Sequence, residues 1–110
     1  MKTKFQILYM KPDWFRHGII GGQPDPKDMT KTHVHLKDIE LDGGSAQLER
    51  IFHEMQAEVW SPDGQAASLI RSKGLAHTSM SIGDVIVVDG DFFLVANSGF
   101  LQFQDGSWVR

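Results

Sequence analysis

Apolar and polar side chains alternate in two segments near the start of the chain. Apolar residues recur at every second position over 3–10, which predicts a strand. A second strand is predicted over 32–42, but its apolar side changes phase by one residue near Lys37-Asp38. Because a β-bulge inserts one extra residue into a strand, we expect one bent strand that pairs with the first.

The segment between these strands, residues 11–31, has no period and is rich in proline and glycine. This composition predicts a long loop, and a loop of that length is either functional or mobile. Trp14 and Phe15 lie within it. Because large aromatic side chains rarely remain in water, we expect both to fold back on the core.

Helical spacing follows in the middle of the chain. Apolar residues recur three and four positions apart over 45–59, which predicts an amphipathic helix. Ser61-Pro62 is a typical helix start, and a shorter second helix is predicted over 62–73. We expect both helices to pack on a sheet.

The last third of the chain is rich in β-branched and aromatic residues. Strands are predicted over 84–88, 91–96, 100–104 and 107–109. Asp89-Gly90 separates the first two runs, and an Asp-Gly pair between apolar runs is a strong signal for a hairpin turn.

These elements predict a single α+β domain over residues 1–110, with the order β-β-α-α-β-β-β. We expect an antiparallel or mixed sheet with two helices on one face. A chain of 110 residues is long enough to bury one modest core.

Composition narrows the class of protein. Hydrophobic residues make up 41% and charged residues 23% of the chain, as in soluble globular domains, and no apolar run is long enough for a membrane helix. The sequence contains no cysteine, which excludes disulfides and thiolate chemistry. No secretory signal is recognisable, so we expect a cytoplasmic protein with no membrane partner and no cofactor.

Charge is divided unevenly along the chain, whose net charge is −3. Residues 1–37 contain seven bases and three acids, a balance of +4, and residues 38–110 contain four bases and eleven acids, a balance of −7. Nucleic-acid binders usually show a much stronger basic footprint, which argues against a nucleic-acid partner. Opposite charges at the two ends of the chain favour head-to-tail association, so a homo-oligomer is compatible with the sequence.

A candidate binding surface lies in the 11–31 segment. Trp14, Phe15, Arg16 and His17 combine aromatic and basic side chains, which grip protein partners or stack on bases. The alternative is an ordered loop that is capped by its own tryptophan.

A candidate metal site lies in the second predicted strand. His33 and His35 are two residues apart, so a regular strand points both imidazoles to one face, and Glu40 follows them. The spacing His-x-His-x4-Glu resembles the first half of the cupin metal motif, although the glycine before it is misplaced and no histidine lies on a later strand. The resemblance implies a small metal-dependent enzyme, and the alternative is two polar residues on an exposed strand face.

A polar turn leads into the C-terminal hairpin. Its residues are His77-Thr78-Ser79-Met80-Ser81-Ile82-Gly83-Asp84, followed by Phe93-Leu94-Val95 and Ser98-Gly99-Phe100. This region resembles the C-terminal part of the YodL-like domain, although Gly83 stands where serine is common and the spacing before Gly99 is shorter. The resemblance implies an α+β module of phage, mobile-element or environmental bacterial proteins, and it implies no catalytic residues.

The sequence therefore supports three hypotheses of function. The first is a phage-associated accessory module that is not an enzyme and acts through protein contacts at the 11–31 segment. The second is a metal-dependent enzyme that uses His33, His35 and Glu40. The third, with the least support, is nucleic-acid binding through the basic N-terminal part.

Overall fold

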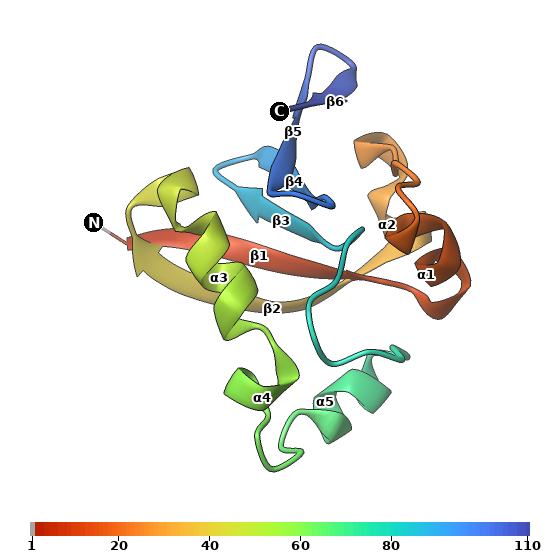
Figure 1. The fold of residues 1–110 in the computed structure, drawn as a ribbon, viewed down its shortest axis with the longest axis vertical. Helices are drawn as coiled ribbons and strands as arrows, with labels where there is room; N and C mark the ends of the chain where they lie inside the picture. The colour runs from red at the N-terminus through yellow and green to blue at the C-terminus, as the bar shows by residue number, and fades with distance from the viewer. Residues whose placement is uncertain (1) are drawn as a thin grey trace.

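Six strands form one sheet in the computed structural model, which describes residues 2–110 (Figure 1). Their bounds are β1 Lys2–Met10, β2 His33–Asp42, β3 Val85–Val88, β4 Asp91–Val95, β5 Phe100–Gln104 and β6 Ser107–Val109. The order across the sheet is β2-β1-β3-β4-β5-β6, and every neighbouring pair is antiparallel. The predicted α+β class is confirmed, and the sheet is antiparallel rather than mixed.

The β-bulge predicted in the second strand is present. Ile7 pairs with Lys37 and Leu8 pairs with His35, which leaves Leu36 as the extra residue on β2. The bulge lies one residue before the predicted position. It explains the change of phase, because apolar side chains before and after it contact the same core cluster.

The middle of the chain forms three helices instead of the two predicted. They are α3 (Leu48–Glu54), α4 (Ala57–Trp60) and α5 (Ala67–Ser72), and a 3-10 turn, η2 (Gly44–Gln47), precedes them. The helix predicted over 45–59 is interrupted because Gln56 adopts an extended backbone with ψ 142°. The Gln56 side chain donates to the carbonyl oxygen of Met80 at 3.1 Å, a tertiary contact that the local pattern does not encode. The helix predicted over 62–73 begins only at Ala67.

The segment 11–31 contains helices, which corrects the prediction of a long loop. They are α1 (Pro12–Ile19), the 3-10 turn η1 (Pro26–Asp28) and α2 (Met29–Thr32). Pro12 starts α1 and Pro26 starts η1, because proline is tolerated in the first turn of a helix. The predicted order β-β-α-α-β-β-β therefore lacks the helices between β1 and β2.

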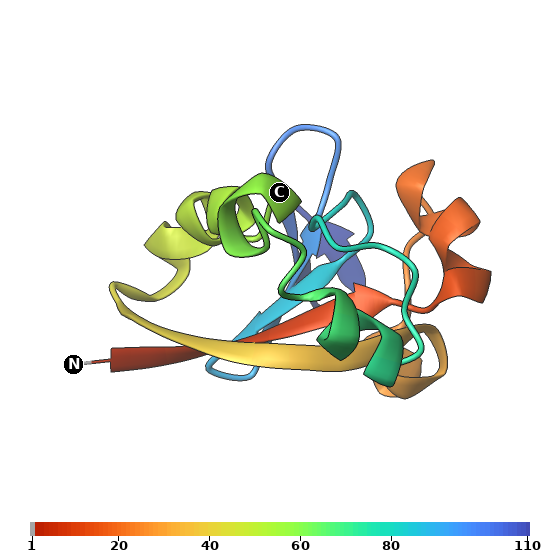
Figure 2. The same ribbon diagram turned by 90° about the horizontal axis from the view of Figure 1, so that it is seen from below.

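Both faces of the sheet bury apolar side chains. On one face, Phe5, Ile7 and Tyr9 of β1 belong to the larger cluster, which α3, α4 and α5 cover. Figure 2 shows α3 and α4 on this side of the sheet. On the other face, Leu8 and Val85 form a smaller cluster with Met29 of α2.

The two Asp-Gly turns follow the sequence signal. Asp89 and Gly90 have φ values of 50° and 83°, and Asp105 and Gly106 have 50° and 84°. Both turns therefore have the positive φ at two successive residues that a type I′ hairpin requires.

Within residues 2–110, the helices are too short or too polar to cross a membrane.

Candidate functional site

A buried carboxyl group joins the start of β3 to the end of β1. Asp84 is fully buried. Its Oδ1 accepts a hydrogen bond from the backbone N–H of Met10, and its Oδ2 accepts one from the backbone N–H of Ser81, both at 2.8 Å. Burial raises the pKa of the Asp84 carboxyl above its ordinary value, and the hydrogen bonds from His77 and the backbone oppose that rise.

His77 is the third donor to this carboxyl group. Its Nε2 lies 3.1 Å from Oδ1 and 3.0 Å from Oδ2 of Asp84, and because a carboxylate only accepts, this nitrogen carries a proton. The imidazole stacks on the ring of Tyr9 with the centroids 4.5 Å apart, and Phe15 of α1 packs against it at 4.8 Å. Only 12% of the His77 side chain is exposed.

The segment 77–84 uses its polar groups to hold itself against the helical face. The carbonyl oxygen of Thr78 accepts hydrogen bonds from Tyr9 Oη at 2.7 Å and from Trp60 Nε1 at 3.0 Å. Ser79 Oγ accepts from the first N–H of α4 at 2.8 Å. Burial raises the pKa of Tyr9 as well. These hydroxyl and carbonyl groups satisfy the fold, and none of them is paired with a base as a nucleophile would be.

His33 lies beside the same centre and is held separately. It is buried, and its Nε2 donates to the carbonyl oxygen of Gly83 at 2.8 Å. Its Nδ1 lies 2.7 Å from the hydroxyl oxygen of Thr32, and that hydroxyl also lies 3.3 Å from the carbonyl oxygen of Met29. Burial lowers the pKa of His33, while the Gly83 carbonyl and the charge of Asp84 oppose that change.

The structure does not bring the predicted metal ligands together. His35 is exposed and pairs with Asp38, with 2.7 Å between Nε2 and Oδ1, and Glu40 is exposed opposite Lys4. Across residues 2–110, no group of three or more His, Asp or Glu side chains is placed to hold a metal ion. His33 and His35 therefore make unrelated hydrogen bonds, and the cupin-like hypothesis has no support from this geometry.

The four predicted binding residues lie on α1, where two of them are half-buried and two are exposed. Trp14 and Phe15 are half-buried, with Phe15 on His77 and the indole Nε1 of Trp14 buried. Phe15 therefore folds back on His77 as predicted, whereas the ring of Trp14 contacts His17 of the same helix, and neither aromatic is a member of the two core clusters. Arg16 and His17 are exposed, so they are the accessible part of the predicted surface.

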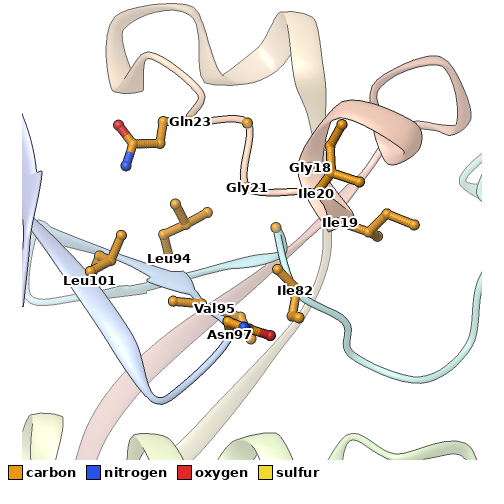
Figure 3. A pocket seen from close by; sticks show the side chains of 13 residues that line it. Gly18, Ile19, Ile20, Gly21, Gln23, Ile82, Leu94, Val95, Asn97 and Leu101 are labelled. Carbon is orange, nitrogen blue, oxygen red and sulfur yellow. The ribbon is translucent and has the colours of Figure 1, made fainter.

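An open cavity lies between the end of α1 with the residues that follow it and the hairpin of β4 and β5 (Figure 3). It has a volume of about 260 Å³, and residues 18–23 form one side while Leu94, Val95 and Leu101 line the other. Two large aliphatic side chains of the 18–23 side are exposed to solvent, Ile20 by 80% and Ile19 by 41%. Exposed aliphatic groups beside an apolar hollow are typical of interaction sites.

A second cavity, of about 220 Å³, adjoins the first. Both cavities are lined by Ile82, Val95, Ala96 and Asn97. The second one extends to Glu49 and Phe52 of α3 and to Phe100 of β5. We refer to the two cavities together as the groove.

The groove contains polar side chains that the fold leaves unused. Gln23 and Asn97 lie on opposite sides of the first cavity (Figure 3). Glu49 lines the second cavity and is exposed. Within the part of the chain that the structure describes, none of these three side chains has a hydrogen-bond or ion-pair partner, so each is available to a ligand.

Two glycines set the position of the groove wall beside α1. Gly18 and Gly83 approach so closely that a Cβ atom on Gly83 would lie 2.9 Å from the Cα of Gly18 and 2.5 Å from Sδ of Met10. Gly83 also has a φ of +100°, which disfavours other residues. The end of α1 can therefore pack directly on the segment before β3.

No family model, curated protein or solved structure matches the chain. Neither the YodL-like nor the cupin resemblance therefore receives independent support. Function has to be inferred from the geometry of the chain itself.

Neither the Asp84 centre nor the groove is predicted from the sequence. The one available signal for the centre is an acidic residue directly before a buried strand, with a histidine seven positions earlier. The groove has no local signal, because its sides come from parts of the chain that are far apart in the sequence.

Proposed function

We propose that this protein is a non-catalytic binding module that holds an apolar part of another protein in the groove beside α1. The observation that carries the proposal is the exposure of Ile19 and Ile20 next to a cavity lined by apolar side chains. Burial of one leucine-sized side chain contributes about 1.5–3 kcal/mol, so a few such contacts suffice for specific binding.

Each of the two cavities by itself is smaller than most pockets that bind small molecules. Pockets that bind small molecules usually have about 300–1,000 Å³. The first cavity has about 260 Å³ and the second about 220 Å³. Each cavity therefore suits one or two side chains of a protein partner.

The chemistry of the buried centre supports a module without catalysis. Both oxygens of Asp84 are used as acceptors within the fold, and only 12% of His77 is exposed. A general base needs an accessible nitrogen within reach of a substrate. His77 and Asp84 instead fix the segment 77–84 to β1.

The YodL-like and phage-associated origin and the cytoplasmic location are part of the same proposal. The resemblance over about 45–103 supports the origin, and the absence of cysteine fits the reducing conditions of the cytoplasm. The residues that carry the resemblance have structural roles here, such as the carboxyl of Asp84 and the close approach at Gly83. A motif of this kind indicates a shared fold more directly than a shared activity.

The proposal is tested by selecting a random peptide library on the immobilised protein and on the variant Ala96→Trp. Ala96 lines both cavities and is half-buried, so a tryptophan at this position fills the place where they adjoin. We expect peptides rich in aliphatic residues to be enriched on the wild-type protein and to lose binding to the variant. Equal enrichment on a variant that melts like the wild type would contradict the proposal.

A further inference from the structure

We infer that the segment bound in the groove is extended and carries a lysine or arginine beside its aliphatic anchor, and that Glu49 selects this basic residue. The inference rests on the proposed function and adds the chemistry of the partner. Three features of the groove lead to it: the single carboxylate among its described lining residues, its two amide side chains and the residues that its cavities share.

The carboxylate of Glu49 is exposed and has no ion-pair partner among residues 2–110. It lines the second cavity together with Phe52 and Phe100. In the same helix, Glu54 is paired with Arg50 at 3.1 Å, so α3 neutralises one of its acids and leaves the other free. Glu49 is also the only charged residue among those that line either cavity within residues 2–110. A cationic group on the ligand would therefore find one partner of opposite charge in the groove and no competitor.

Gln23 and Asn97 provide recognition of a peptide backbone. Each amide side chain offers both a donor and an acceptor, which matches the N–H and C=O of one peptide unit. They lie on opposite sides of the first cavity and make no hydrogen bonds in the structure of residues 2–110 (Figure 3). An extended segment exposes its backbone groups on both edges, whereas a helix uses them internally.

The two cavities adjoin along Val95, Ala96 and Asn97. Leu94 and Leu101 of the first cavity belong to one core cluster, and Phe100 of the second belongs to the other, so the cavities open on opposite faces of the sheet. A ligand that places an aliphatic side chain in the first cavity reaches the second one by passing around the end of the β4–β5 hairpin. There it meets the carboxylate of Glu49 and the aromatic side chain of Phe52. The long stem of lysine or arginine packs on apolar surface while its charged end reaches a carboxylate, which fits this arrangement.

The test uses two random peptide libraries of aliphatic and small residues that differ in one fixed position, lysine in the first and glutamate in the second. We expect the wild-type protein to recover the lysine library about two- to fivefold better, as an exposed ion pair allows. The variant Glu49→Lys is expected to reverse this preference. Equal recovery of both libraries by the wild-type protein and by Glu49→Lys would overturn the inference.

The matched control is Glu58→Lys, an equally large charge change at an exposed residue that does not line the groove. This variant is expected to keep the lysine preference, and loss of the preference in it would show that net charge, not Glu49, is responsible. If the wild-type protein recovers both libraries equally and Ala96→Trp recovers neither, the proposed function is supported and this inference is wrong. If the wild-type protein recovers the libraries no better than Ala96→Trp does, both the proposed function and this inference are wrong. Self-association that Ala96→Trp abolishes would identify a second copy as the occupant and overturn the inference.

Discussion

The buried centre around Asp84 and the groove beside α1 use their polar groups in opposite ways. In the centre, the Asp84 carboxyl accepts hydrogen bonds from three donors, and the neighbouring carbonyl of Gly83 accepts one from His33. In the groove, Gln23 and Asn97 have no partners within the described residues, and aliphatic side chains beside them are exposed. One ring nitrogen of the centre, Nδ1 of His77, is buried without a hydrogen-bond partner among the described residues. The amide groups of Gln23 and Asn97 are instead exposed to solvent, where a ligand can reach them.

The difference teaches that chemically reactive residue types are a poor guide to function in this chain. Its histidine and carboxyl groups at the centre hold the structure together. The surface that is open to a partner consists mainly of aliphatic and amide side chains. The predictions below separate the two regions, since changes in the centre should unfold the protein and changes in the groove should not.

The largest effect is expected for Asp84→Asn. An amide can accept at only one of its two terminal atoms, so one of the backbone N–H groups of Met10 and Ser81 is left facing another donor. Breaking a buried polar network of this kind costs about 3–5 kcal/mol of unfolding free energy. Urea unfolding followed by circular dichroism measures the loss.

The control for this change is Asp38→Asn. Asp38 also accepts from a histidine, but that pair is exposed, with side chains 39% and 48% accessible. Exposed ion pairs contribute about 0–1 kcal/mol. If the two substitutions cost the same, Asp84 would not be the anchor described here.

The next largest effect is expected for Gly83→Ala, compared with Gly21→Ala. Both glycines have a φ of +100°, but a Cβ on Gly83 collides with Met10 and Gly18, whereas a Cβ on Gly21 meets nothing within 4 Å. Backbone strain alone costs about 1–2 kcal/mol, and overpacking adds about 1–3 kcal/mol. We expect Gly83→Ala to lower the melting temperature clearly more than Gly21→Ala. Equal shifts would show that the close approach of α1 is not needed.

A smaller effect is expected from the titration of His33. Burial lowers the pKa of His33 below the ordinary histidine value of 6.5, so just below that pH the unfolded chain binds more protons than the folded one. The unfolding free energy therefore falls as the pH drops from 6.5 towards the lowered pKa. The slope is at most about 1.4 kcal/mol per pH unit, the limit for a single proton.

The variant His33→Gln isolates this contribution. Its unfolding free energy should depend less on pH than that of the wild type in the same window. A wild-type slope in His33→Gln would mean that another group carries the dependence. Denaturant titrations at a series of pH values provide the comparison.

The smallest effect on stability is expected for Ile20→Asp. Its side chain is 80% exposed, and such surface substitutions usually change the unfolding free energy by less than about 0.5 kcal/mol. Binding of peptides selected on the wild-type protein should nevertheless be lost, since a charge replaces an aliphatic group beside the cavity. Val59→Asp, at a position that is 44% exposed and outside the groove, should bind normally.

Much of the sheet is predictable because its signals are local. Alternating apolar and polar residues predict β1 and β2, and the Asp89-Gly90 pair predicts the hairpin. The change of phase predicts the bulge to within one residue of Leu36. The helices are less predictable because tertiary contacts set their ends. The interruption at Gln56 depends on a bond to Met80, which lies 24 residues later.

The candidate site is the part least open to prediction. His33 and His35 share a sequence pattern but not an environment, because one is buried against Gly83 and the other pairs with Asp38. The carboxyl of Asp84 binds the backbone of a residue 74 positions earlier. Such long-range proximity is a result of the fold, and no spacing rule in the sequence contains it.

The most direct test of the account is an NMR titration of the isotope-labelled protein with a peptide selected on the wild type. The account predicts chemical-shift changes of the backbone amides along 18–23 and 95–101 and at Glu49, with the amides of His77 and Asp84 unchanged. Shifts centred on His77, Asp84 and His33, with the 18–23 segment silent, would contradict it.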